Sequence, residues 1–136
     1  MKYYLMTAFF GIITIGLITS CKKEKNNPAP VLAATKTIRF ILYTNKDFSN
    51  DEHNIAFSLH IANNNGTFGF DSVVARMKIK DIPNKANQLV FERTAPLNTT
   101  TLTAGFTYAI ENVGYSWHLD TVAANEKFKI IEYPFE

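Results

Sequence analysis

Apolar and polar residues alternate along most of the chain after residue 36. Between residues 54 and 62, for example, Ile55, Phe57, Leu59 and Ile61 are separated by smaller or polar residues. A repeat of two is typical of a strand with one buried face, whereas a helix repeats every 3.6 residues. The pattern predicts strands at 37–44, 54–62, 68–75, 88–93, 106–110, 115–119 and 128–133.

Turn-forming residues separate these predicted strands. Residues 63–66 (Asn-Asn-Asn-Gly) form a strong turn signal, because Asn and Gly tolerate positive φ. The turn at 111–114 (Glu-Asn-Val-Gly) is short and contains Gly, so it predicts an antiparallel hairpin between the two strands that flank it. A single helical turn is expected at 83–86, after its Pro, with Asp81 as its cap. Polar loops are expected at 96–101 and 123–126.

Seven short strands with regular turns, and no sustained helical stripe, predict an all-β domain. We expect an antiparallel β-sandwich of about seven strands over residues 36–136, either immunoglobulin-like or transthyretin-like. A small β-barrel is the alternative, because periodicity does not distinguish a barrel from a sandwich. One such domain also suits a chain of 136 residues.

The first thirty residues follow a different pattern. Lys2 precedes an almost wholly apolar run from residue 5 to 18, and the next charge is Lys22. This run is shorter than the about 20 apolar residues of a membrane span, so it predicts an export signal over residues 1–20. An uncleaved anchor helix is the alternative. Residues 22–30 (Lys-Lys-Glu-Lys-Asn-Asn-Pro-Ala-Pro) are polar and contain Pro, so residues 21–35 are predicted to be the cysteine and a flexible tether.

The end of the apolar run resembles the lipobox of bacterial lipoproteins. Residues 17–21 read Leu-Ile-Thr-Ser-Cys, with an aliphatic residue three positions before the cysteine and small residues between. The resemblance implies cleavage before Cys21, diacylglycerol on its thiol and a further acyl chain, such as palmitate, on its amine. Each buried CH₂ contributes about 0.8 kcal/mol, so two or three chains anchor firmly.

The tether partly resembles that of Bacteroidetes-type outer-membrane lipoproteins, in which a Lys followed by two acids favours the cell surface. Residues 23–25 read Lys-Glu-Lys and supply only one acid. The resemblance therefore implies a lipid anchor in the outer membrane and leaves open the periplasmic or the surface leaflet.

Composition narrows the classes of function. Cys21 is the only cysteine, so an intrachain disulfide and a cysteine-based metal site are excluded. The formal net charge is only +2, and from residue 36 onward ten basic side chains stand against eleven acidic ones. A nearly neutral domain offers no electrostatic footprint for nucleic acid.

No sequence motif points to catalysis. The chain lacks a G-x-S-x-G elbow, an HExxH motif and a phosphate-binding glycine loop. His53, His60 and His118 are not at metal-ligand spacing, and His60 and His118 fall opposite the apolar positions of their strands. We expect these two to face solvent or a sheet edge, and we expect no enzyme activity and no cofactor.

One loop has a weak calcium signal. Asp47, Ser49 and Asp51 alternate as the first ligands of a calcium loop do. Glu52 stands where such a loop needs a glycine, and Ser58 stands where it needs the closing acid. An ordinary solvated loop is therefore favoured, and no metal site is expected.

Two tripeptides resemble the Asp-Ser/Thr-aliphatic acceptor of Bacteroidetes-type O-glycosylation. They are residues 71–73 (Asp-Ser-Val) and 120–122 (Asp-Thr-Val), and they make Ser72 and Thr121 candidate acceptors. Both tripeptides also read as ordinary strand ends.

Tyr115 and Trp117 are candidates for a glycan-binding or partner-binding platform, because sugar faces stack on flat rings. They alternate in phase with Leu119. That phase favours a buried face over an exposed platform.

These patterns lead to three hypotheses about function. The first is a lipid-anchored envelope protein whose sandwich binds a protein or a glycan without catalysis. The second is a structural or accessory subunit of an outer-membrane complex, and the third, less favoured, is a small hydrolase. Small sandwiches commonly serve as interaction modules, although fold alone does not define function.

Overall fold

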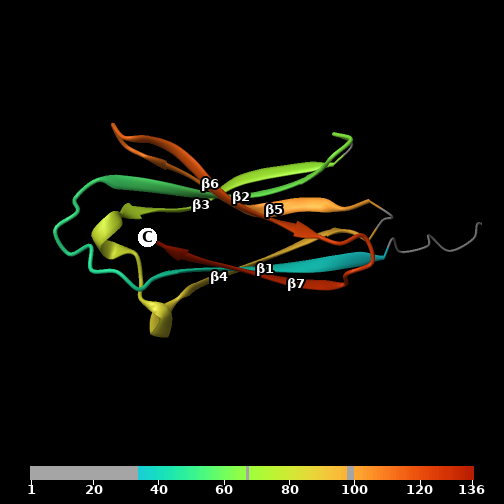
Figure 1. Ribbon diagram of the computed structural model, residues 1–136, viewed down its shortest axis with the longest axis horizontal. Coiled ribbons are helices and arrows are strands. Elements are labelled where there is room, and N and C mark those ends of the chain that lie inside the picture. Colours follow the sequence, from blue (N-terminus) through green and yellow to red (C-terminus); the bar gives the residue numbers. More distant parts are fainter. Residues whose placement is uncertain (1–33, 67, 98–99) are drawn as a thin grey trace, which may run out of the picture. The chain divides into compact units, whose positions relative to one another are not determined.

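The computed structural model describes residues 34–66, 68–97 and 100–136, which form seven strands in two sheets (Figure 1). Strands make up nearly all of the regular structure, which confirms the predicted all-β sandwich. The strands are β1 (Thr35–Thr44), β2 (Asn54–Asn63), β3 (Gly69–Lys78), β4 (Leu89–Pro96), β5 (Leu102–Ile110), β6 (Gly114–Val122) and β7 (Phe128–Phe135). The predicted signal, Cys21 and nearly all of the predicted tether lie outside the described residues.

The two sheets have the strand orders β4-β1-β7 and β3-β2-β5-β6. Every neighbouring pair is antiparallel except β1 and β7, which run parallel, so one pair departs from the predicted pairing. Immunoglobulin domains place their first, second, fourth and fifth strands in one sheet. The first strand here pairs with the fourth and seventh instead. This strand order differs from that of an immunoglobulin domain, and the architecture is an all-β sandwich of a three-stranded and a four-stranded sheet.

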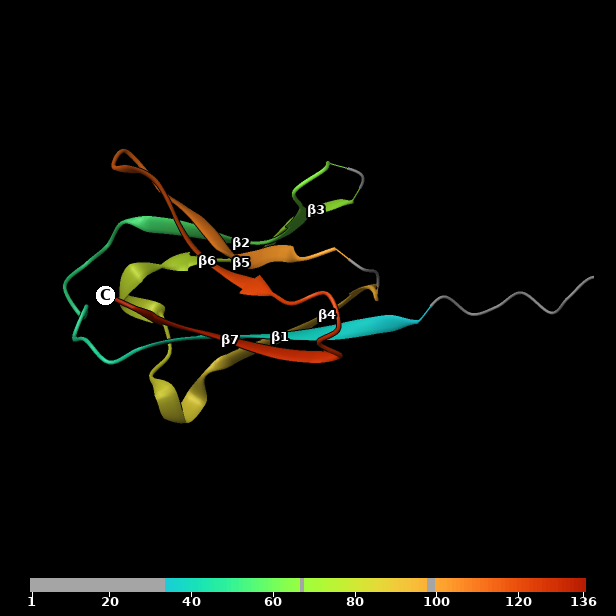
Figure 2. The ribbon, with the colours of Figure 1, turned by 45° about the vertical axis from the view of Figure 1, so that its right-hand side comes forward.

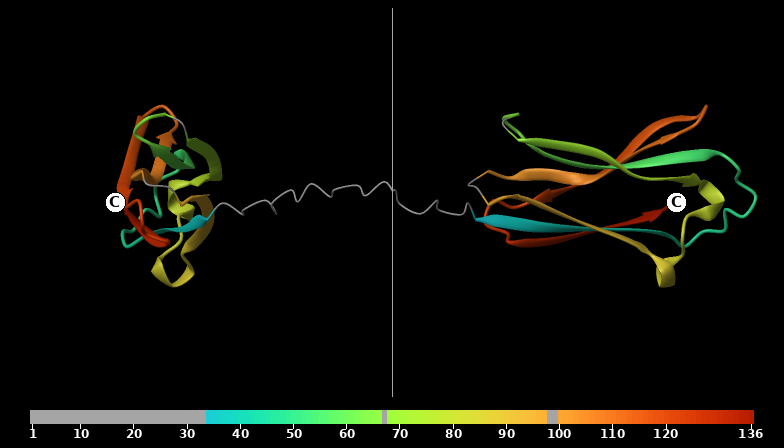
Figure 3. Two further views of the ribbon diagram at one scale, coloured as in Figure 1. Left: turned by 90° about the vertical axis from the view of Figure 1, so that its right-hand side faces the viewer. Right: turned by 180° about the vertical axis from the view of Figure 1, so that it is seen from behind.

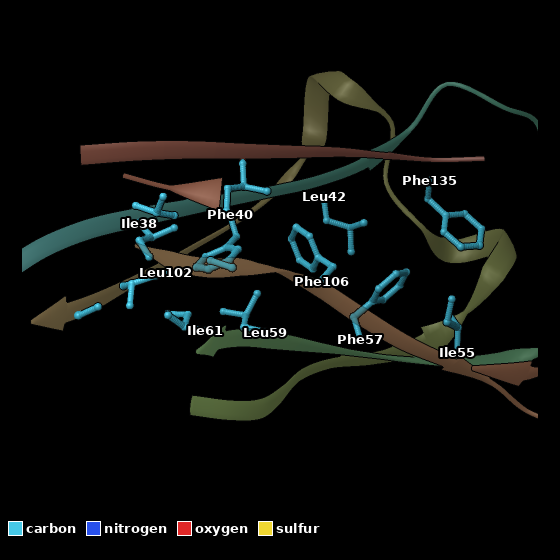
Figure 4. Packing of buried hydrophobic residues seen from close by; sticks show 14 of the residues in the cluster. Ile38, Phe40, Leu42, Ile55, Phe57, Leu59, Ile61, Leu102, Phe106 and Phe135 are labelled. Carbon is cyan, nitrogen blue, oxygen red and sulfur yellow. The ribbon is translucent and has the colours of Figure 1, made fainter. Parts of the chain in front are cut away.

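The core lies between the two sheets, where large apolar side chains from both inner faces interlock (Figure 4). Phe106 of β5 packs edge-on against Phe40 of β1, with 5.7 Å between ring centroids, and against Phe57 of β2 at 6.4 Å. Edge-to-face rings stabilise a core beyond the area they bury. The alternating residues of β2 face this core, as predicted.

A lysine closes one end of the core. Lys36 lies on the same face of β1 as Ile38 and is only 1% exposed. Its Nζ donates hydrogen bonds to the carbonyl oxygens of Ala123 at 2.7 Å and Ala124 at 3.0 Å. Burial lowers the pKa of Lys36, against the opposing charge of Glu126. The two carbonyls fix the β6–β7 loop to the start of β1.

The connection from β3 to β4 contains two short 3₁₀ turns, Ile79–Asp81 and Lys85–Asn87, rather than the single turn predicted at 83–86. Asn84 caps the second turn, because its side chain accepts hydrogen bonds from the backbone N–H groups of Ala86 and Asn87. The prediction that Asp81 caps it is wrong, since Asp81 ends the first turn. An Asn side chain in this place satisfies donors that a helical turn leaves free.

The two ends of the sandwich carry different parts of the chain. β1 begins at one end, where Ala34 O accepts a hydrogen bond from Leu97 N at 2.7 Å. The C-terminus and the tip of the β5–β6 hairpin lie at the opposite end, called here the distal end (Figure 2). The hairpin tip bends away from the three-stranded sheet (Figure 3). The described part of the chain contains no helix with the length and hydrophobicity of a membrane span.

Candidate functional site

Tyr115 and Trp117 lie on the outer face of the four-stranded sheet. Each is 62% exposed, and their ring centroids are 6.1 Å apart with planes tilted by 42°. Leu119, on the same face, is 38% exposed. The sequence-based interpretation that this face is core is therefore wrong. The alternative, an exposed aromatic platform, agrees with the structure.

The hairpin turn decides which face of β6 is buried. Ile110 pairs directly with Gly114, so only residues 111–113 form the connection and Gly114 belongs to the strand. This register places Tyr115 opposite Ala109, on the outer face, because directly opposed residues share a face of the sheet. A connection one residue longer would have turned Tyr115 and Trp117 into the core.

The inner face of β6 carries His118, which pairs with Phe106 across the ladder. The His118 ring stacks on Tyr133 of β7, with 4.7 Å between centroids and planes 16° apart. The prediction that His118 faces solvent or a sheet edge is wrong about the face. Burial raises the pKa of Tyr133.

A salt bridge extends this contact between β6 and β7. Lys129 Nζ lies 2.9 Å from a carboxylate oxygen of Asp120 and lowers the pKa of that carboxyl. β6 is an edge strand, and two of its inner side chains, His118 and Asp120, contact Tyr133 and Lys129 of β7. Polar groups with partners are tolerated there, which is why alternation misassigned the strand.

Small side chains cover the sheet beside Tyr115 and Trp117. In the row of Tyr115 they are Ala109 of β5 and Ala56 of β2; in the row of Trp117 they are Thr107 and Ser58. The strip formed by Ala56, Ser58, Gly105, Thr107 and Ala109 is called here the small-residue strip. Because these side chains are short, the two rings stand above their neighbours.

The far side of the small-residue strip is bordered by longer side chains of β2 and β3. In the register these are Arg76, opposite Ala56, and Val73, opposite Ser58. His60, on the outer face as predicted, has its Nδ1 3.0 Å from a carboxylate oxygen of Asp71. On the outer face of the sheet, the short side chains of the small-residue strip thus lie between the aromatic side chains of β6 and the longer side chains of β3.

The loop between β1 and β2 uses its candidate calcium ligands for its own turns. Asp47 accepts a hydrogen bond from Ser49 N at 2.9 Å, and Asp51 accepts from His53 N at 3.1 Å. The bond from Ser49 N lowers the pKa of Asp47, and the hydrogen bond of the His53 ring, followed by that of His53 N, lowers the pKa of Asp51. In residues 34–66, 68–97 and 100–136, no three His, Cys, Asp or Glu side chains are grouped as metal ligands would be.

Glu52 in this loop binds two lysines that sequence reasoning missed. Its carboxylate lies 2.6 Å from Lys78 Nζ and 2.5 Å from Lys80 Nζ, and these bonds lower the pKa of Glu52 from 4.5 to about 2. A folded-state pKa below the unfolded value means that the ion pairs stabilise the fold above pH 4.5. This stability is lost as the pH falls from 4.5 toward 2.

We expect the difference in unfolding free energy between the wild type and Glu52→Gln to be present at pH 7 and to vanish near pH 2. The difference is small even at pH 7, because the pairs are exposed. Urea denaturation across this range measures it. A Glu52 carboxyl that titrates by NMR at its ordinary value near 4.5 would contradict the pairing.

The two candidate O-glycosylation acceptors have different surroundings. Thr121 is exposed on the outer face of β6 and opposes Thr103. Ser72 is half-buried on the core side of β3, opposite the buried Leu59. Thr121 is therefore the more accessible hydroxyl, and modification at either residue stays a prediction.

No family model, no curated protein and no solved structure matches this chain.

Proposed function

We propose that this chain is a lipid-anchored cell-envelope protein whose sandwich is a non-catalytic binding module, and that its ligand is a glycan. The observation that supports the proposal is the exposure of Tyr115 and Trp117 side by side on one face. Large aromatic side chains left in water cost free energy unless a partner covers them, so a group of them marks an interaction surface. A protein partner is the alternative that the experiment below separates from a glycan.

The chemistry of this face favours a sugar. A pyranose ring presents one face of C–H groups, which packs on an aromatic ring, and a rim of hydroxyl groups. Tyr115 and Trp117 supply two ring faces, and the half-buried Ser58 places a hydroxyl group in the row of Trp117. A stable protein interface covers about 800 Å² on each partner, with an aromatic centre well inside its rim. Two aromatic rings on an edge strand suit a ligand narrower than a protein partner, such as a glycan chain.

Binding rather than catalysis is proposed because the sequence carries no nucleophile motif. The described histidines also have other contacts. His53 and His60 pair with neighbouring carboxylates, and His118 stacks on Tyr133.

We expect Trp117→Ala to lower glycan affinity about tenfold, because it removes one of two stacking surfaces. The free energy of unfolding is expected to change by less than about 0.5 kcal/mol, since the side chain is mostly exposed. A glycan array identifies the ligands, and calorimetry with wild type and variant measures the affinity. Phe128→Ala, an exposed aromatic on the other sheet, is the matched control.

Two results would contradict the glycan proposal. One is an array on which the wild type retains no glycan. The other is a Trp117→Ala variant that binds every retained glycan as tightly as the wild type does. Loss of a co-purifying protein in the Trp117→Ala variant would instead favour a protein partner.

The anchor is proposed from the resemblance at residues 17–21. We expect Cys21→Ser to take up no labelled palmitate, to keep its full precursor size and to lose its lipid-dependent anchoring. Wild-type chain is expected to label and to partition into detergent. Equal labelling of both forms, or labelling of neither, would contradict lipidation at Cys21.

A structural or accessory role is the second candidate, and one observation favours it. The outer face of the three-stranded sheet exposes Val90, Phe128 and Ile130, each between 44% and 48%. Such a patch suits contact with another envelope protein. Mild cross-linking in the native membrane, followed by Ile130→Asp as the disrupting variant, separates this role from glycan binding.

A further inference from the structure

A cavity of about 680 Å³ opens at the distal end of the four-stranded sheet. Its floor includes Ala56 and Ala109, two members of the small-residue strip, and its polar lining includes Arg76, Asp81 and Glu111. In this part of the lining, the neighbouring strands β2 and β5 place the methyl groups of Ala56 and Ala109 opposite each other, beside the longer side chain of Arg76. A hollow with a few polar groups at its border is a common form of ligand site.

The cavity and the aromatic platform lie in one row of the sheet. Arg76 pairs with Ala56, Ala56 with Ala109, and Ala109 with Tyr115, so all four residues share the outer face. Three strand spacings of about 4.8 Å separate the Cα atoms of Arg76 and Tyr115 by about 14 Å. A ligand stacked on Tyr115 and lying across the two alanines therefore reaches the cavity.

Some polar side chains that line the cavity already have partners within the protein, and others do not. The guanidinium of Arg76 has neither a hydrogen bond nor an ion pair with any residue in the described ranges, whereas the ammonium group of Lys78, also in the lining, is bound by Glu52. Glu111 accepts a hydrogen bond from Asn54 Nδ2 at 2.6 Å and keeps further acceptor positions. Asp81 adds a second carboxylate. The lining thus offers N–H donors from Arg76 and carboxylate acceptors from Asp81 and Glu111.

We propose that this cavity is a second subsite of the same ligand, and that the ligand is a neutral oligosaccharide running from Trp117 and Tyr115 across Ala56 and Ala109 to Arg76. The inference rests on the proposed glycan binding and adds to it the length and charge of the ligand. A hydroxyl group both donates and accepts, so a sugar satisfies the Arg76 guanidinium and the two carboxylates together. A uronic acid or sulfate would satisfy Arg76 and be repelled by Asp81 and Glu111.

The test is calorimetry of the full chain with neutral oligosaccharides of one to six units, chosen from those retained on the array, and with acidic oligosaccharides of matched length. We expect affinity to rise with length until the ligand spans the row, and to be lower for acidic chains. Arg76→Gln is expected to lower affinity for the long neutral chains about tenfold or more and to leave monosaccharide binding unchanged. Arg39→Gln, an exposed arginine on the other sheet, is the matched control.

The outcomes separate the two proposals. If Trp117→Ala weakens binding and Arg76→Gln leaves the affinity for every ligand unchanged, binding at Tyr115 and Trp117 is supported and the second subsite is overturned. If acidic chains bind more tightly than neutral ones and Arg76→Gln removes that preference, the ligand is anionic and the assignment of charge is overturned. If no oligosaccharide binds, glycan binding itself fails. Circular dichroism of each variant confirms that the fold is retained.

Discussion

Replacing Phe106 with alanine is expected to lower the free energy of unfolding by about 3–5 kcal/mol, as for other fully buried Phe side chains. Phe106 is 0% exposed and contacts rings from both sheets: Phe40 of β1, Phe57 of β2 and Tyr133 of β7. Its removal leaves a cavity where the two layers meet, and close-packed neighbours close such a cavity only partly. Urea denaturation followed by tyrosine and tryptophan fluorescence measures the loss.

The matched control for this prediction is Phe128→Ala. Phe128 is 44% exposed, and its ring meets Arg39, whose guanidinium carbon lies 5.4 Å from the ring centroid. We expect this variant to lose less than about 1 kcal/mol. Equal losses for the two variants would show that Phe106 does not occupy the centre of the core.

Gly105→Ala is expected to lower the free energy of unfolding by about 3 kcal/mol, at the upper end of the range for overpacked sites. A Cβ atom at Gly105 would lie 2.0 Å from the carbonyl oxygen of His118 and 2.8 Å from Leu119 Cα. Both obstacles are backbone atoms, so β5 and β6 must separate to admit the methyl group. Faster hydrogen exchange along β6 is expected to accompany the loss.

Gly69→Ala is the matched control, because no atom lies within 4 Å of a Cβ at Gly69 and its φ is not in the left-handed region. Its stability is expected to stay the same or to rise slightly, since alanine restricts the unfolded chain. A Gly105→Ala variant as stable as Gly69→Ala would contradict the close approach of β6. Because β6 carries Tyr115 and Trp117, Gly105→Ala is also expected to weaken glycan binding.

The alternation of apolar and polar residues predicted the strands well where one face of a strand is buried in the core. β2 is the clearest case, since Ile55, Phe57, Leu59 and Ile61 are all buried and their neighbours are not. Composition and turn residues then gave the all-β class. These features depend on residues close in sequence, and local patterns report them directly.

The buried face of β6 could not be predicted in the same way. Alternation defines two faces of a strand but does not say which one is inside. The choice depended on whether Gly114 belongs to the turn or to the strand, a difference of one residue. It depended further on β7, which covers the inner face and offers Tyr133 and Lys129 to His118 and Asp120.

The candidate binding surface could not be predicted from the sequence, because it depends on which residues of neighbouring strands pair with each other. Arg76 is 39 positions from Tyr115, and their common row appears only in the register of β3, β2, β5 and β6. Tyr115 and Trp117 were identified as candidates, but the cavity and Arg76 were not. A long side chain opposite alanines carries no local signal, because Arg76, Ala56 and Ala109 lie on three different strands, far apart in the sequence.

The pairing of β1 between β4 and β7 constrains the order in which the chain acquires its structure. Both partners of β1 come later in the sequence, β4 by residue 96 and β7 only by residue 135, and Thr37 N donates a hydrogen bond to Lys127 O at 2.9 Å. A chain that folded from its N-terminus onward would therefore expose β1 without a neighbour until residue 96, and without its second neighbour until residue 135. Such distant pairings form slowly. The three-stranded sheet is therefore complete only when β7, the last strand of the chain, joins β1.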